Sequence, residues 1–159
     1  MKKVLQRVVS ASKGDCARAV LASLFEVDLE QIDPETATPA TPAKQVKAIR
    51  KVFEGHGYAG WFPSGRWQYR KNLRTIMKMD GGVNGYFYVV VPSQTLEGVS
   101  HAVVIDKHGN IVHDPNPNQK ALKLTWRDLT MIYTTQRIIF TKEGEFMYLA
   151  DYEKQRDAE

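Results

Sequence analysis

The residue pattern changes along the chain from helical periodicity to strand-like runs, and this change constrains the fold more than any other feature. Apolar residues recur at three- and four-residue spacing over 16–25 and 42–53, which predicts two amphipathic helices. Three later runs are β-branched or aromatic and predict strands over 86–91, 101–106 and 110–114. A tight turn at 107–109 makes the last two antiparallel. Helices followed by antiparallel strands predict an α+β fold.

The remaining segments predict one domain over residues 1–150. Residues 2–9 read as a short extended segment, and the three prolines between 33 and 42 predict a surface loop. In the helix that follows, Ala43, Val46, Ile49 and Phe53 are the expected buried face. A further helix is expected over 66–79, a final hairpin over 135–150, and a polar, frayed tail over 151–159.

Composition places the chain among globular proteins. Its 159 residues are 43% hydrophobic, enough to bury a core without the help of disulfide bonds or bound metals. A single cysteine forms no internal disulfide, so nothing implies an oxidising compartment. The first nine residues lack an apolar run long enough for a signal peptide or a membrane span. We therefore expect a cytoplasmic protein with no membrane partner.

The charge is unevenly distributed. Residues 1–80 carry 14 basic and 8 acidic side chains, whereas residues 141–159 carry 3 basic and 6 acidic ones. The segment 66–79 has aromatic residues and five basic residues without an acidic one, and this mixture suits an anionic partner. The basic residues are Arg66, Arg70, Lys71, Arg74 and Lys78. A solvated helix face is the favoured explanation of these residues, and no nucleic-acid-binding motif is present, so nucleic acid is the least favoured partner.

The only cysteine stands at the start of a predicted helix. Asp15 is a good N-cap, because its carboxylate can accept hydrogen bonds from the first-turn amides. Cys16 then occupies the first helical position, where the helix dipole favours a thiolate. Gly14 leaves room for close approach of backbone or substrate. These features suit a nucleophile, although a small buried thiol packed beside Ala19 is an equal alternative.

A histidine and an aspartate come together in the predicted hairpin. His101 begins one strand and Asp114 ends its partner, so antiparallel pairing brings them to the same end of the sheet. Either residue can instead have a purely structural role, His101 bonded to a backbone carbonyl and Asp114 opening a turn before Pro115. His108 and His113 are expected to face solvent, and His56 lies in a glycine-rich loop. No pair has metal-ligand spacing and no phosphate loop is present, so neither metal nor cofactor is expected.

Three stretches resemble the papain-like cysteine peptidase superfamily, nearest to double-glycine leader peptidases and small phage and bacterial proteins of that shape. These stretches are GDCARAVLASLF, SHAVVID and VHDPNPN. The resemblance implies N-terminal helices packed on a C-terminal antiparallel sheet. It also implies Cys16 as nucleophile, His101 as general base, Asp114 as orienting residue and Gln6 as oxyanion donor. Asn116 is an alternative orienting residue. Ala17 departs from the leader peptidases, which usually have glycine after the cysteine.

The expected function is a cysteine-dependent hydrolase that attacks an amide or acyl bond of a peptide or protein. Deamidation and acyl transfer use the same residues and remain alternatives. Another alternative is a non-catalytic papain-like binding protein, phage-encoded and acting on a factor in the host cytoplasm. The sequence does not distinguish these substrates and roles.

Overall fold

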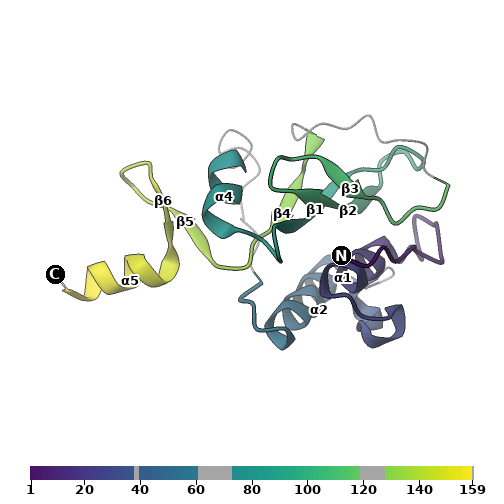
Figure 1. Cartoon of the computed structure of the whole chain (residues 1–159), viewed down its shortest axis with the longest axis horizontal. Helices are drawn as coiled ribbons and strands as arrows, with labels where there is room; N and C mark the ends of the chain where they lie inside the picture. The colour runs from purple at the N-terminus through teal and green to yellow at the C-terminus, as the bar shows by residue number, and fades with distance from the viewer. Residues whose placement is uncertain (38–39, 61–72, 119–127, 159) are drawn as a thin grey trace.

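A computed structural model describes residues 1–37, 40–60, 73–118 and 128–158 of the chain. These residues form an α+β fold in which helices lie beside an antiparallel sheet (Figure 1). The sheet contains four strands in the order β3-β2-β1-β4. Its strands are β1 (Tyr86–Pro92), β2 (Ser100–Asp106), β3 (Ile111–His113) and β4 (Met131–Tyr133). The α+β prediction is confirmed at this level.

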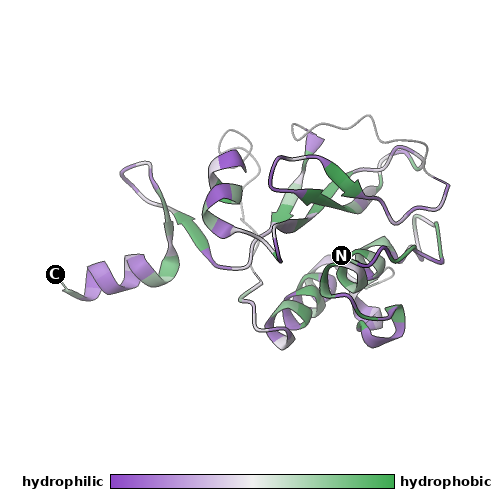
Figure 2. Cartoon of the chain, viewed as in Figure 1, coloured by the Kyte–Doolittle hydropathy of each residue, from purple (hydrophilic) through white to green (hydrophobic). Residues whose placement is uncertain are grey.

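The two central strands are buried on both faces, as their apolar composition predicts. On one face, Tyr88, Ala102 and Val104 pack against α1 (Cys16–Phe25). On the opposite face, Val89 and Val103 pack with residues that include Met77 of α4 (Leu73–Asp80). Alternate side chains therefore belong to two separate cores, and the hydropathy colouring shows the strands of the sheet as mainly hydrophobic (Figure 2).

The second long helix, α2 (Pro42–Gly55), begins as its sequence predicts, with Thr41 as N-cap and Pro42 at the first position. Ile49 and Phe53 are buried as predicted, whereas Ala43 is exposed and Val46 is only half-buried. The buried face starts one turn later because the first turn of the helix extends past the core. Two short 3₁₀ turns, Leu29–Gln31 and Pro34–Thr36, connect α1 to α2.

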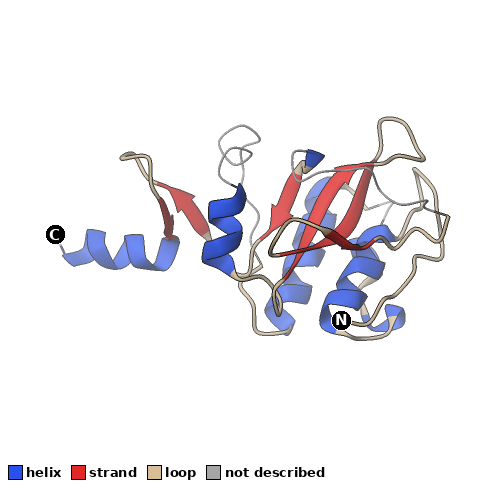
Figure 3. Cartoon of the chain, turned by 45° about the horizontal axis from the view of Figure 1, so that its top comes forward, coloured by secondary structure: helices blue, strands red, loops and turns tan. Residues whose placement is uncertain are grey.

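The C-terminal segment projects from the rest of the molecule (Figures 1 and 3). It contains the hairpin β5 (Ile138–Phe140) and β6 (Phe146–Tyr148), followed by helix α5 (Leu149–Ala158). The hairpin matches the prediction, but a helix occupies the stretch where we expected a frayed tail. No residue of α5 is buried, so the polar composition of the stretch reports exposure and not fraying.

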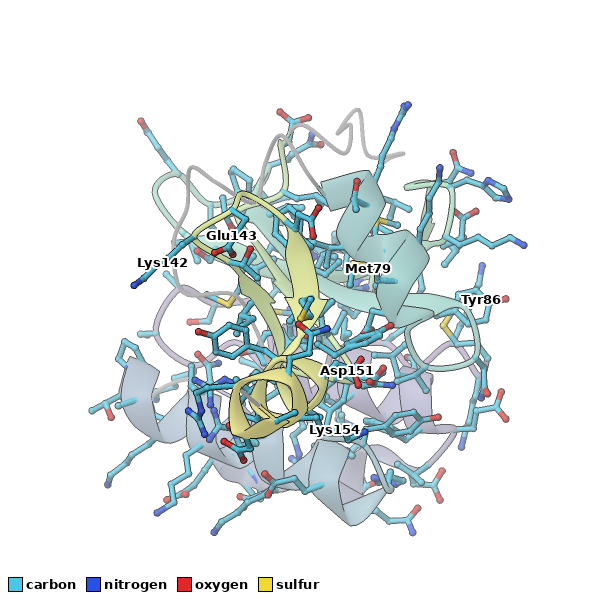
Figure 4. The ribbon with its side chains drawn as sticks, turned by 90° about the vertical axis from the view of Figure 1, so that its left-hand side faces the viewer. Met79, Tyr86, Lys142, Glu143, Asp151 and Lys154 are labelled. Atoms are coloured by element: carbon cyan, nitrogen blue, oxygen red, sulfur yellow. The ribbon has the colours of Figure 1, made fainter. Side chains whose placement is uncertain are left out.

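The Tyr148 hydroxyl donates to the Met79 carbonyl and so ties the hairpin to α4. Figure 4 views the molecule from the side of this projecting C-terminal segment, with Asp151 and Lys154 of α5 in front of the rest of the molecule. None of the described helices is long and apolar enough to cross a membrane.

Candidate active site

Cys16 is the first residue of α1, as the sequence predicts, and its side chain is half-buried. The preceding glycine is needed there for steric reasons. A Cβ on Gly14 would lie 2.5 Å from the Ser10 carbonyl oxygen, so no larger residue fits without moving the turn. Gly14 thus permits the close approach that delivers the chain to the helix start, although the group that approaches is the chain's own backbone.

Asp15 occupies the N-cap position, but its side chain does not cap the helix. The Asp15 carboxylate accepts hydrogen bonds from the amides of Arg7, at 3.1 Å, and Val8, at 3.0 Å. The side-chain prediction was therefore wrong, because a long-range partner outcompetes the first-turn amides. One consequence is that the amino end of α1 stays open beside Cys16. Another is that the hydrogen bonds from Arg7 and Val8 hold the N-terminal segment next to the residue before Cys16.

His101 and Asp114 form a buried pair. The distance between His101 Nε2 and Asp114 Oδ1 is 2.7 Å, and the two side chains are only 9% and 12% exposed. Since Nε2 is engaged by the carboxylate, Nδ1 is the ring nitrogen that remains for another partner. Cys16 is a close neighbour, because its side chain contributes, after Asp114, to the raised pKa of the imidazole.

The electrostatics of this group favour a charged imidazole. Burial alone lowers the pKa of His101, but the hydrogen bond to Asp114 and the contact with Cys16 outweigh it and raise the pKa from 6.5 to about 9. An imidazolium held between a carboxylate and a sulfur stabilises negative charge on that sulfur. The same sulfur lies close enough to Tyr88 to contribute, after burial and Tyr133, to the raised pKa of that phenol.

A β-bulge interrupts β3 shortly before Asp114. Ile111 pairs with Ile105 and His113 pairs with Val104, so Val112 is an extra residue. Continuous pairing would instead place Asp114 opposite Ala102, on the face that packs against α1. With the bulge, His113 lies opposite Val104, and the Asp114 carboxylate that follows meets His101 near the start of β2. The bulge therefore sets the register of the residues that lead into Asp114.

His113 is displaced by the same bulge and is buried, not solvent-facing as predicted. Its Nε2 lies 2.8 Å from the Val4 carbonyl oxygen, and burial lowers its pKa. His108 is exposed at the hairpin tip, as predicted. His56 is exposed and stacked on Phe25, with ring centroids 4.1 Å apart. Neither of the exposed histidines is part of the His101 site.

Asn116 supports Asp114 and does not replace it. The backbone N–H of Asn116 donates to Asp114 Oδ1 at 2.8 Å. The Asn116 side-chain Nδ2 donates to Thr95 Oγ1 at 3.5 Å. Within the described residues, Asp114 Oδ2 is buried without a hydrogen-bond partner. Of the two candidate orienting residues, Asp114 is the one in contact with the imidazole.

Gln6 lies at the same place in the fold. Its backbone amide donates to the Pro115 carbonyl at 2.9 Å, directly after Asp114. Its side-chain nitrogen Nε2 donates to the Val8 carbonyl at 2.9 Å, and the residue is 6% exposed. An amide nitrogen carries two hydrogens, so one N–H remains beyond the bond to Val8. Gln6 of the N-terminal segment, Cys16 at the start of α1, and His101 and Asp114 of the β2–β3 hairpin thus lie in one region of the structure.

The other predicted features lie elsewhere. Arg66, Arg70 and Lys71 fall outside the described residues, while Arg74 and Lys78 are exposed on α4. Among the described residues, no group of three His, Cys, Asp or Glu side chains is arranged to hold a metal ion.

No family model, curated protein or solved structure matched the chain in the three comparisons.

Proposed function

We propose that the protein is a cysteine-dependent hydrolase acting on an amide or related acyl bond through Cys16, His101 and Asp114. The observation that carries this proposal is the placement of His101 between a carboxylate and the only sulfur nucleophile at a helix start. A base oriented by a third group and directed at a nucleophile is the general arrangement of covalent acyl-transfer catalysis. It also agrees with the papain-like resemblance of the sequence.

Each residue has a distinct task in the proposed reaction. The Cys16 thiolate attacks the carbonyl carbon, and His101 holds the thiol proton. His101 gives that proton to the departing amine as the tetrahedral intermediate collapses to a thioester. Water, deprotonated by His101, then attacks the thioester and releases the acid. Asp114 stabilises the imidazolium and keeps Nδ1 directed at the sulfur.

The intermediate also needs donors for its oxyanion. The remaining N–H of Gln6 and the backbone N–H of Cys16 are the proposed pair, the latter at the open end of α1. A peptide or protein amide is the first substrate class. Deamidation of a side-chain amide and acyl transfer to an acceptor other than water would use the same four residues.

The experiment is to trap the acyl-enzyme. Purified protein is mixed with p-nitrophenyl acetate, and release of p-nitrophenol is followed together with intact mass. We expect a burst and an acetyl adduct on Cys16 in the wild type, no adduct in Cys16→Ala, and much slower acylation in His101→Ala. Labelling of the wild type at lysines alone, with Cys16 unmodified, would contradict the proposal.

A second candidate is a binding protein on the same scaffold, supported by the projecting C-terminal arm whose helix α5 buries no residue. This role predicts that Cys16→Ala retains full effect in a cellular assay, whereas charge reversal at Asp151 and Lys154 removes it. The hydrolase predicts the opposite pattern.

A further inference from the structure

The N-terminal segment, residues 1–9, runs beside α1 and is held at two places along its length. Near its start, the Val4 amide donates to Ser23 Oγ at 2.9 Å and the Val4 carbonyl meets His113. Near its end, the segment meets Asp15, the residue directly before Cys16. Gln6 lies between these two attachments. Its backbone is held by the Pro115 carbonyl, whereas the orientation of its side chain depends on the Val8 carbonyl.

Val8 is bonded to Asp15 in both directions. The Val8 amide donates to Asp15 Oδ1 at 3.0 Å, and the Asp15 amide donates to the Val8 carbonyl at 3.3 Å. The same Val8 carbonyl accepts the side-chain N–H of Gln6 at 2.9 Å. Hydrogen bonds thus hold the Val8 backbone on both sides, with its N–H on the Asp15 carboxylate and its C=O on the Asp15 amide and the Gln6 side chain.

The three residues that these hydrogen bonds link differ in their burial. Asp15 is only 8% exposed and Gln6 only 6%, whereas Val8 is 42% exposed. The Val8 side chain contributes little packing, so the backbone of Val8 is fixed chiefly by Asp15. A carboxylate that accepts two backbone amides makes stronger bonds than a neutral acceptor would.

We propose that Asp15 is a positioning residue, which orients the Gln6 side-chain amide as oxyanion donor by fixing the backbone of Val8. This inference rests on the proposed hydrolase function. Asp15 does not touch the substrate and moves no proton. Its effect is confined to steps that develop an oxyanion, because only those steps use the Gln6 donor.

Two reagents separate such steps from simple thiolate reactivity. Acylation by p-nitrophenyl acetate passes through a tetrahedral oxyanion, whereas alkylation by iodoacetamide is a direct displacement at carbon without one. The ratio of the two rates at Cys16 therefore reports the oxyanion donors. A general structural defect would slow both reactions and leave the ratio unchanged.

We expect Asp15→Ala to lower this ratio about 10- to 100-fold, within the range for removal of one oxyanion donor. Gln6→Ala should lower it to a similar extent, and the double variant should be no lower than Gln6→Ala alone, because both changes remove the same donor. Asp15→Asn keeps an acceptor oxygen and should stay within about threefold of the wild type. Asp157→Ala, which removes the exposed ion pair with Arg156 on α5, is the control and should leave the ratio unchanged.

An unchanged ratio in Asp15→Ala, or fully additive effects in the double variant, would overturn the inference. If Asp15→Ala does not fold, Val8→Pro removes the same amide donor from the other side, and the same loss of the ratio is expected there. A wild-type Cys16 that reacts with neither reagent would overturn the proposed function itself, which is a different result.

Discussion

Replacing Asp114 with asparagine should change the pH dependence of stability, because Asp114 holds His101 in its charged form. The substitution preserves shape and leaves an oxygen that can still accept from Nε2. What it removes is the negative charge beside a buried imidazole, since the two side chains are only 9% and 12% exposed. Without that charge, burial favours the neutral ring, and the pKa of His101 should fall from about 9 towards or below 6.5.

The size of the effect follows from the pKa itself. A rise from 6.5 in the unfolded chain to about 9 in the native protein corresponds to about 3 kcal/mol of stabilisation. This contribution is fully present below pH 6.5, where both states are protonated, and is lost as the pH rises through 9. Asp114 and Cys16 share it, so Asp114→Asn should cost on the order of 1–2 kcal/mol at pH 6 and much less at pH 10.

Urea denaturation of both proteins at pH 6 and pH 10 measures this difference, and histidine NMR titration measures the pKa of His101 directly. Asp106→Asn is a matched control, because Asp106 bonds the hairpin turn and lies away from His101. It should leave the pKa of His101 at about 9. An Asp114→Asn penalty that is equal at both pH values, with an unchanged pKa of His101, would refute the reasoning.

Two further substitutions test how the site is held in place. Gly14→Ala forces a Cβ against the Ser10 carbonyl, so it should lower the free energy of unfolding by about 1–3 kcal/mol in urea denaturation; an effect within error would mean that the turn moves freely. Ser23→Ala leaves the Val4 amide without its 2.9 Å acceptor, and we expect a loss of about 1–2 kcal/mol. Hydrogen exchange at Val4 should rise in that variant, and unchanged protection would contradict the role given to Ser23.

Local patterns account for the parts of the fold that were predicted correctly. The apolar spacing after Cys16, the Thr41-Pro42 helix start and the β-branched run over 86–91 each encode their element within a few residues. The turn at 107–109 then places His101 and Asp114 at one end of the sheet. Because the hairpin is short, this proximity could be predicted without knowledge of the rest of the fold.

Contacts between distant segments and weak local signals explain what the sequence analysis missed. Asp15 bonds a segment seven to eight residues earlier in the chain, and no local signal distinguishes this from capping. The bulge at Val112 places His113 opposite Val104, on the face that packs against α1, where His113 contacts Val4; because both faces of the sheet are covered, alternation alone does not make a side chain solvent-facing. Strand β4 has three residues, too few for a periodic signal. Helix α5 has an apolar start but no buried side chain, so its composition resembles that of a disordered tail.

The rate of Cys16 alkylation by iodoacetamide, measured against pH in the wild type and in His101→Ala, tests the central claim most directly. If His101 sustains a thiolate, the wild type should react at pH 6 nearly as fast as at pH 9, and His101→Ala should lose most of its reactivity at pH 6. A wild-type profile that rises with pH like that of a free thiol, unchanged in His101→Ala, would show that no activated pair exists.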